Sequence, residues 1–314
     1  MKKVVFLFPG QGSQEIGMAK AFYEKDDEVK QLIDKAEEIL NVPIKTLMFE
    51  GPQEELTKTE HAQPALLLTS AVITKVLEKE GVKPVMAAGH SLGEYSALVC
   101  GSSLQVEDAL KLVQTRGRLM EKAYPSGKGA MAAVLGLDED TVDRITSEAS
   151  SDEEVVDVAN YNCPGQIVIS GTKSGVERAS EALKEAGAKR VIPLNVSGPF
   201  HSRLMESASV EFKNVLHDTT IQHANIPIYA NVTASPTQQS EEIYDLLVQQ
   251  LYSPVRFSET ISNMMEHDID AFVEVGSGKV LSGLVRKVNR RMKTFAIQDP
   301  DSLHEFLNWY KEVE

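Results

Sequence analysis

Apolar positions in the first 122 residues alternate between short unbroken runs and longer stretches in which they recur every three or four residues. The short runs are typical of buried strands, and the longer stretches are typical of amphipathic helices. The pattern predicts strands at 4–8 and 85–88 and helices at 28–40, 64–79, 92–100 and 105–122, with Pro64 in the first turn of its helix. Strands that alternate with helices in this way indicate a parallel α/β sheet.

The rhythm changes after residues 124–129, where a proline and two glycines suit a boundary between domains. Beyond them the pattern predicts the order β-α-β-β-α-β, which is the ferredoxin-like arrangement. The predicted strands lie at 130–136, 155–160, 166–170 and 189–194, and the predicted helices at 138–149 and 173–186. The arrangement ends at the Ser197-Gly198-Pro199 turn.

The α/β pattern then resumes. It predicts helices at 202–216, 241–251, 257–266, 279–290 and 302–312, and strands at 226–230, 270–275 and 294–298. We therefore predict a discontinuous large α/β domain formed by residues 1–127 and 197–314. A ferredoxin-like small domain at 128–196 is inserted into it.

The composition, 42% hydrophobic and 25% charged residues, is ordinary for a soluble globular protein. No stretch approaches the roughly 18 apolar residues of a membrane span, and the apolar run at 4–8 is too short for a signal peptide. Cys100 and Cys163 have no second pair with which to form a metal cluster or a disulfide framework. We expect reduced, structural cysteines, a cytoplasmic location, no contact with membranes and a monomer.

The net charge of −14 disfavours nucleic-acid binding, because phosphate affinity needs a dense basic surface. An anionic substrate must therefore bind at a local cluster of basic residues. Residues 279–293 contain six basic side chains and no acidic one, namely Lys279, Arg286, Lys287, Arg290, Arg291 and Lys293. The sequence leaves open whether this segment is a solvated helix face or docks an anion.

Gly89-His90-Ser91-Leu92-Gly93 matches the G-x-S-x-G pattern and lies between a predicted strand and a predicted helix. That context predicts a nucleophile elbow, in which small residues let the serine hydroxyl project from a tight turn. A structural turn bounded by glycines is the alternative. A serine also needs a base, and of the seven histidines only His201 lies in a glycine and proline turn at the domain boundary, where clefts form.

Two further features are candidates for substrate contacts. The loop at 8–14 leaves the first strand at its carboxyl end, and its glycines allow the Gln11 amide to approach a ligand closely. The loop does not fit a nucleotide-binding pattern. Arg116 lies in a helical stretch, where it either extends to solvent or caps a helix end, or, if it faces a cleft, binds a carboxylate through two nitrogens.

Taken together, these motifs resemble the malonyl-CoA:acyl-carrier-protein transacylases of type II fatty acid synthesis. The likeness extends over essentially the whole chain and rests on seven motifs in the order of that family. They are Phe8-Pro9-Gly10-Gln11-Gly12-Ser13-Gln14, Gln63-Pro64-Ala65, Gly89-His90-Ser91-Leu92-Gly93-Glu94, Gln114-Thr115-Arg116-Gly117, Asn160-Tyr161-Asn162, Pro199-Phe200-His201-Ser202 and Gln250-Leu251-Tyr252-Ser253-Pro254-Val255.

The resemblance implies an α/β-hydrolase-like core and a ping-pong malonyltransferase. It assigns the roles of nucleophile to Ser91, base to His201 and histidine-orienting group to Gln250. The amides of Gln11 and Leu92 are implied as the oxyanion hole.

The implied substrate-binding residues are Arg116, which would hold the malonyl carboxylate, together with Gln63, Asn160, Asn162 and Phe200. Phe200 resembles the malonyl-selecting version of the family. Asn160 and Asn162 either line the cleft or satisfy backbone groups locally.

The implied partners are malonyl-CoA and an acyl carrier protein, and no metal or redox cofactor is needed, because the coenzyme A thioester is the substrate. Three alternatives remain at this point. They are a serine thioesterase or hydrolase of acyl-CoA, an acyltransferase of a polyketide pathway, and an acyl-binding scaffold without catalysis.

Overall fold

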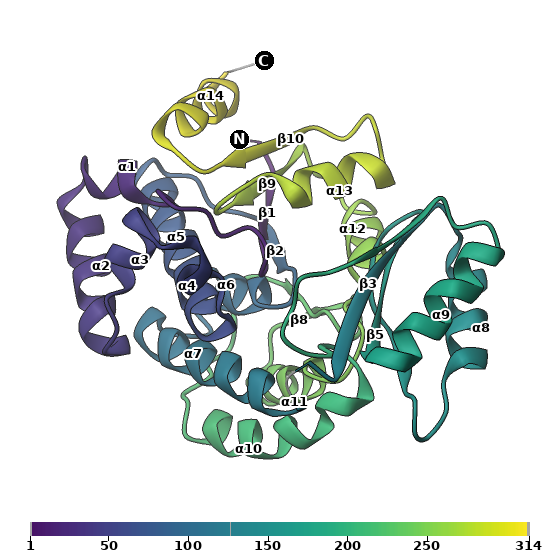
Figure 1. The fold of residues 1–314 in the computed structure, drawn as a ribbon. Helices are drawn as coiled ribbons and strands as arrows, with labels where there is room; N and C mark the ends of the chain where they lie inside the picture. The colour runs from purple at the N-terminus through teal and green to yellow at the C-terminus, as the bar shows by residue number, and fades with distance from the viewer. Residues whose placement is uncertain (1, 126, 313–314) are drawn as a thin grey trace.

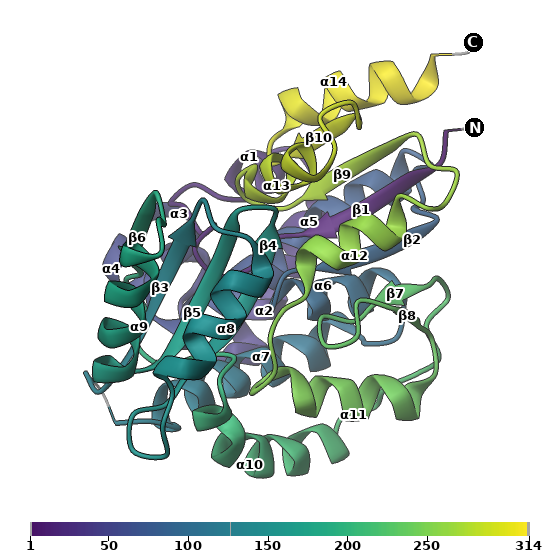
Figure 2. The same ribbon diagram turned by 90° about the vertical axis from the view of Figure 1, so that its right-hand side faces the viewer.

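The computed structural model describes residues 2–125 and 127–312. Met1, Ser126 of the predicted boundary segment, and residues 313–314 of the predicted large domain lie outside the described residues. The chain forms two sheets, a six-stranded large sheet in the order β10-β9-β1-β2-β7-β8 and a four-stranded small sheet in the order β4-β5-β3-β6 (Figures 1 and 2).

The centre of the large sheet is β1 (Val4–Phe8), which pairs in parallel with β2 (Met86–Gly89) on one side and β9 (Ala271–Val275) on the other. The parallel strands β10 (Thr294–Ile297) and β7 (Ile228–Tyr229) extend the sheet, and β8 (Pro236–Thr237) pairs antiparallel to β7. All five residues of β1 are fully buried. Such an unbroken apolar strand is expected where helices cover both faces of a parallel sheet.

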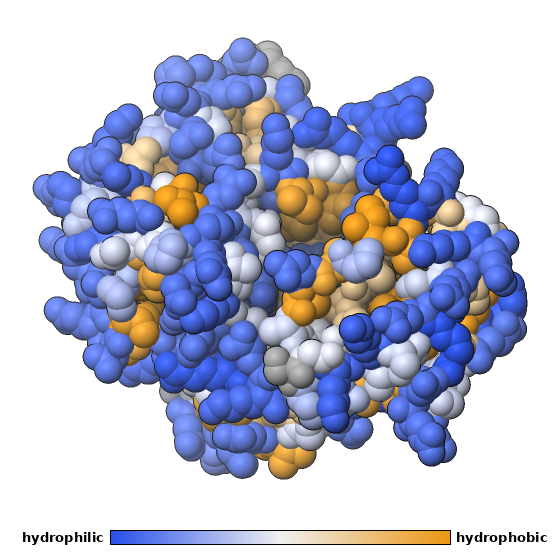
Figure 3. Space-filling model, in the orientation of Figure 1, coloured by the Kyte–Doolittle hydropathy of each residue, from blue (hydrophilic) through white to orange (hydrophobic). Residues whose placement is uncertain are grey.

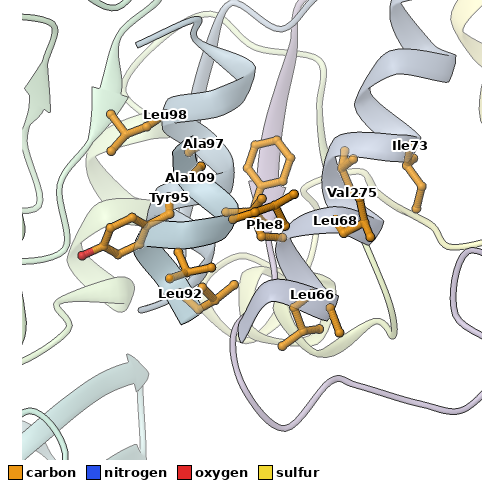
Figure 4. Packing of buried hydrophobic residues seen from close by; sticks show 14 of the residues in the cluster. Phe8, Leu66, Leu68, Ile73, Leu92, Tyr95, Ala97, Leu98, Ala109 and Val275 are labelled. Atoms are coloured by element: carbon orange, nitrogen blue, oxygen red, sulfur yellow. The ribbon is translucent and has the colours of Figure 1, made fainter. Parts of the chain in front are cut away.

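Helices pack on both faces of the large sheet because successive β1 side chains point to opposite sides. Val4, Phe6 and Phe8 belong to a core that contains residues of α2 (Asp27–Leu40), α5 (Thr59–Lys79), α6 (Gly93–Cys100), α7 (Val106–Lys122), α10 (Glu206–His217) and α14 (Pro300–Lys311). Val5 and Leu7 pack in a second core with α12 (Phe257–Met264) and α13 (Val280–Val288). Figure 4 shows Phe8 between apolar side chains of α5 and α6.

The small sheet consists of β3 (Gly129–Leu135), β4 (Val156–Cys163), β5 (Gln166–Thr172) and β6 (Arg190–Pro193), all antiparallel. Together with α8 (Glu139–Ala149) and α9 (Lys173–Glu185) they form a separate core, and Figure 2 shows both helices against the sheet. This chain order and strand order are those of the ferredoxin-like arrangement, so the predicted fold class is confirmed. The exact domain boundaries stay a prediction.

The helix predicted at 64–79 begins earlier than expected, at Thr59, so Pro64 lies inside α5 rather than in its first turn. The first residues of α5 are mostly polar, and the apolar spacing that signals a helix therefore starts too late. The longer helix buries Gln63, which is 1% exposed. Its position matters for the candidate site.

Several short elements have no counterpart in the sequence-based prediction. They are α1 (Lys20–Tyr23), α3 (Ile44–Glu50), α4 (Gln53–Thr57) and β8, and the strand expected at 226–230 is only two residues long. The helix predicted at 202–216 begins as a 3₁₀ turn at Arg203–Met205, and α11 spans Ser240–Gln250. Elements this short span at most about two helical turns, too few for a repeating apolar pattern to stand out, so pattern alone does not reveal them.

Within the described part of the chain, no helix is both long and apolar enough to cross a membrane. The thiols of Cys100 and Cys163 are both free.

The close approach of α5 and α7 gives a test of the fold. A Cβ atom at Gly117 in α7 would lie 2.8 Å from the carbonyl oxygen of Thr59, whereas a Cβ at Gly283 in α13 would meet nothing within 4 Å. We predict that Gly117→Ala lowers the free energy of unfolding by about 1–3 kcal/mol through overpacking. Gly283→Ala, the matched control, should raise it by up to about 1 kcal/mol through helix propensity. Urea denaturation measures both, and equal effects would contradict the packing assigned to α7.

Candidate active site

Ser91 lies in the sharp turn between β2 and α6, with a φ of 51°, in the left-handed region that non-glycine residues rarely adopt. The glycines on either side permit this turn. A Cβ at Gly89 would lie 1.9 Å from the carbonyl carbon of Gly93, and a Cβ at Gly93 would lie 2.0 Å from the carbonyl oxygen of Phe8. The elbow thus packs closely against the end of β1. The positive φ at Ser91 is a strained conformation, and in such a turn the serine hydroxyl projects from the backbone.

Asn231, in the loop after β7, stabilises this turn through hydrogen bonds to its backbone. Its Oδ1 accepts a hydrogen bond of 2.8 Å from the Ser91 amide, and its Nδ2 donates one of 2.7 Å to the Gly89 carbonyl. Asn231 is fully buried. Sequence reasoning missed it, because one asparagine outside any motif gives no signal of which backbone groups it will meet.

The hydroxyl of Ser91 is paired with His201. The distance between Ser91 Oγ and His201 Nε2 is 2.8 Å, and His201 Nδ1 lies 2.8 Å from the main-chain carbonyl oxygen of Gln250. A carbonyl can only accept, so Nδ1 carries the hydrogen and Nε2 is left free to accept the serine proton. Gln250, at the end of α11, therefore orients the imidazole through its backbone rather than through its side chain.

The environment of His201 keeps the ring neutral. Burial, followed by the positive charge of Arg116, lowers its pKa to about 3. The imidazole is therefore unprotonated at neutral pH and available as a base. Nδ1 faces a neutral carbonyl, so no carboxylate on the ring counteracts the effects of burial and of the neighbouring guanidinium.

Arg116 is 1% exposed and does not reach solvent, which rules out the alternative that it extends from the helix surface. Its Nη1 donates to Gln63 Oε1 at 2.9 Å, and its Nη2 donates to Gln250 Oε1 at 3.0 Å and to Ser91 Oγ at 3.1 Å. The guanidinium also lies over the Tyr95 ring, 5.2 Å from its centroid. All of these partners are neutral, so a buried positive charge lies beside the serine hydroxyl and can take a ligand carboxylate.

The backbone amides of Gln11 and Leu92 were expected to form the oxyanion hole. They lie after the carboxyl end of β1 and directly before α6, respectively. Gln11 follows β1, where its side chain donates to Thr59 Oγ1 at 3.2 Å, and Leu92 directly follows Ser91 at the start of α6. Within residues 2–125 and 127–312, neither backbone amide donates to a protein acceptor. Both are therefore free to donate to a ligand.

The remaining candidate residues surround this group without a hydrogen bond to Ser91. Asn162 Oδ1 lies 2.8 Å from His90 Nε2, and Asn160 is buried in β4 at the bridge to Val255. Phe200 is 5% exposed and packs beside Gly198, directly before the base.

A cleft of about 430 Å³ opens beside His201, between α8, β4 and the segment at 252–254. The surface is also hollowed between the two sheets, and hydrophobic residues line that hollow (Figure 3). Of the candidate site residues, the cleft thus reaches His201, the partner of the Ser91 hydroxyl. Among the described residues, no group of three or more His, Cys, Asp or Glu side chains is placed to hold a metal ion.

An α/β sheet with a serine elbow, a hydrogen-bonded histidine and free amides at the turn is the arrangement of enzymes that transfer acyl groups through a serine. The acyl transferase domain family matches residues 5–297, and the chain belongs to this family. The protein is thus an acyltransferase.

Its relatives narrow the similarity further. The malonyl CoA-acyl carrier protein transacylase of Bacillus subtilis is 50% identical over 312 residues, which cover 99% of this chain and 98% of the relative. The solved acyl carrier protein S-malonyltransferase of Vibrio cholerae is 41% identical with a TM-score of 0.94, covering 97% of this chain and 99% of that one. A malonyl-transacylase solved in complex with a type II PKS acyl-carrier protein is 40% identical with a TM-score of 0.94, covering 98% and 99%.

Proposed function

We propose that the protein transfers malonyl from malonyl-CoA to the phosphopantetheine thiol of an acyl carrier protein through an ester on Ser91, and so supplies fatty acid chain elongation. The observation that carries this proposal is the buried Arg116, whose Nη2 lies 3.1 Å from Ser91 Oγ and whose partners are all neutral. An acyl group with a free carboxylate satisfies that charge. The names of the relatives support the same substrate and acceptor.

In the first half-reaction, His201 takes the proton of Ser91 as the hydroxyl oxygen attacks the thioester carbonyl carbon. The amides of Gln11 and Leu92 donate to the oxyanion that forms. When the tetrahedral intermediate collapses, the carbon–sulfur bond breaks, and the imidazolium returns its proton to the coenzyme A sulfur. Malonyl remains as an ester on Ser91.

In the second half-reaction, the thiol of the carrier's phosphopantetheine attacks the ester and gives its proton to His201, which passes it to Ser91 as the ester bond breaks. Throughout, the malonyl carboxylate pairs with Arg116, which Gln63 and Gln250 hold in place. Phe200, Asn160 and Asn162 line the space around the acyl group. The mechanism uses no metal or redox cofactor.

The acidic carrier protein docks on the basic segment at 279–293. All six basic side chains of the segment are exposed, and Val280, which is 55% exposed, adds an apolar contact. Gly278 lies against Ser13 of the loop that follows β1, and Lys287 Nζ donates to Gln166 Oε1 of the small sheet. The segment thus borders both the loop that carries Gln11 and the small sheet.

The same chemistry would serve a polyketide pathway, and the solved complex with a type II PKS carrier favours that as the second candidate. A thioesterase or hydrolase would pass the acyl group to water, and the buried arginine clamp favours the transferase over it. A non-catalytic scaffold would not need the Ser91 and His201 pair. We further propose a cytoplasmic location, in keeping with two free thiols, and a monomeric state.

We predict that incubation with malonyl-CoA alone yields a stable malonyl ester on the wild-type protein, seen by intact-protein mass spectrometry. Ser91→Ala should abolish the ester and leave the fold intact, because it removes a single hydroxyl at the elbow and no part of the apolar core. His201→Ala should slow ester formation about a hundredfold or more. Labelling of the Ser91→Ala variant would contradict the nucleophile, and rapid turnover without a stable ester would indicate a hydrolase.

We predict that Arg116 determines the preference for malonyl over acetyl thioesters. Acetyl leaves the buried guanidinium without a partner, and sites built around a polar partner reject the analogue that lacks it by factors of up to about ten thousand. Arg116→Ala should therefore collapse the malonyl to acetyl ratio of kcat/KM. Arg116→Lys, which keeps the charge but loses the planar fork, should already impair malonyl transfer. If the ratio survives in Arg116→Ala, selectivity lies elsewhere, and Phe200 is the next residue to replace.

We predict that charge reversal at Arg286 and Arg290 raises the KM for the carrier protein, most strongly at low salt, where exposed charges are least screened. The matched control reverses Lys25 and Lys83, two exposed lysines outside the segment. Steady-state kinetics at several salt concentrations measure the effect. Equal carrier kinetics in both double variants at low salt would mean that the segment is only a solvated helix face.

A further inference from the structure

Glu94 is a buried carboxylate close to the nucleophile that the proposed mechanism does not use. It lies in the first turn of α6 and is 3% exposed. Its Oε2 accepts a hydrogen bond of 2.8 Å from Gln250 Nε2 and one of 3.0 Å from the Asn231 amide. Burying a carboxylate this deeply costs free energy of folding, so we infer that Glu94 has a role besides packing.

The contact with Gln250 matters because a glutamine amide has one donating and one accepting end. An ionised carboxylate only accepts, so Glu94 draws the NH₂ group of Gln250 towards itself. The other end, Oε1, is then left to accept from Arg116 Nη2 at 3.0 Å. With the amide turned round, its NH₂ group would face the guanidinium, donor against donor.

Glu94 is also connected to both Ser91 and His201, because its hydrogen-bond partners Asn231 and Gln250 bind those two residues. Asn231 holds the Ser91 amide through Oδ1, and Gln250 holds His201 through its main-chain carbonyl. Gln250 Nε2 also lies 3.1 Å from the Ser91 carbonyl oxygen and from Asn231 Oδ1, so its two hydrogens are shared among three acceptors, of which Glu94 is the nearest and the only carboxylate. One carboxylate thus connects the two residues that fix nucleophile, base and clamp.

We propose that Glu94 is a positioning residue for malonyl transfer, which acts by setting the orientation of the Gln250 amide and thereby the acceptor that faces Arg116. Asn231 acts with it by fixing the backbone of the elbow. The inference rests on the proposed function, because it concerns the same clamp. It assigns no contact between Glu94 and the substrate.

The protonation state of Glu94 should control this arrangement near neutral pH. Burial raises the pKa of Glu94 to about 7. The hydrogen bonds from Asn231 and Gln250 and the charge of Arg116 act in the opposite direction and lower the pKa, but burial has the larger effect. The charged or titratable groups that face it are Arg116 from α7 and Tyr95 from its own helix. Above that pKa the carboxylate only accepts, whereas below it the carboxylic acid can donate, and the Gln250 NH₂ group loses its one charged acceptor and keeps only the weaker, neutral ones at Ser91 and Asn231.

The first test compares the acylation of Ser91 by malonyl and acetyl thioesters in Glu94→Gln and Glu94→Asp. Glu94→Gln keeps the size but adds a donor, and loss of a hydrogen bond to a charged group predicts a decrease in malonyl acylation of about tenfold to a hundredfold. The malonyl to acetyl ratio should fall with it. Glu94→Asp keeps an acceptor-only group and should retain more of the ratio.

Glu274→Gln is the matched control, because Glu274 is also fully buried and accepts from the backbone amides of Leu281 and Ser282 at 3.0 and 2.8 Å. It should lower the Tm without changing the malonyl to acetyl ratio. An unchanged ratio and rate in a folded Glu94→Gln protein would overturn the proposal, and so would a loss of ratio that Glu274→Gln shares.

The second test needs no variant that might fail to fold. The pH dependence of kcat/KM is measured with a malonyl thioester of N-acetylcysteamine, which has no group that titrates between about pH 5.5 and 8. Because kcat/KM reports the free enzyme, wild type should lose activity as the pH falls through about 7, whereas His201, with a pKa of about 3, stays neutral there.

Glu94→Gln should show a lower rate that is flat over the same range. A flat wild-type profile would overturn the role of Glu94. Complete absence of a malonyl ester on wild type would instead refute the proposed function, so the two failures are distinguishable.

Discussion

The buried positive charge of Arg116 is the constraint around which the candidate site is arranged. A guanidinium removed from water must find hydrogen-bond acceptors, and a direct carboxylate partner would cancel the charge that a substrate carboxylate needs. The chain meets both demands with two glutamine oxygens, from α5 and α11, which accept without neutralising. The nearest carboxylate in this network, Glu94, makes no hydrogen bond to Arg116 and instead accepts from Gln250 and from the Asn231 backbone amide. The close packing of α5 against α7 at Gly117 follows from the same demand, since it brings Gln63 within reach of the guanidinium.

Gln250 connects three segments that are far apart in the sequence, and the candidate site depends on all three. Its backbone carbonyl faces His201, its side-chain oxygen faces Arg116, and its side-chain nitrogen faces Glu94. A usual triad places an acid on the histidine, which would add a negative charge near the guanidinium that we propose holds the malonyl carboxylate. A neutral carbonyl orients the ring without that repulsion. The arrangement trades some basicity of the histidine for compatibility with an anionic acyl group.

Much of this could be predicted from the sequence, because some of its signals are local. The strand, glycine turn and helix around Ser91 are contiguous, and the apolar spacing of the long helices and of β1 is regular, so the fold class and the elbow follow from pattern alone. Arg116 could not be decided that way, since helical spacing does not tell whether a polar position faces a cleft or solvent. Asn231 and Glu94 gave no signal as site residues, because their importance comes from hydrogen bonds to segments far away in the chain. Resemblance to a family supplied Gln250, but only the fold shows that its backbone carbonyl meets the histidine.

If Arg116 and His201 have the roles that we propose, the charge of Arg116 also couples substrate choice to the strength of the base. After burial, that charge is the next largest cause of the low pKa of His201. A carboxylate placed on the guanidinium compensates that charge, which by itself favours a higher pKa of the imidazole when an acyl group with a free carboxylate binds. An acetyl group brings no such compensation and leaves the base weak. Discrimination then acts on the proton-transfer step as well as on binding, which is where an enzyme gains rate rather than affinity alone. A site with an aspartate on the histidine would lose this coupling, because its base would already be strong before the substrate arrived.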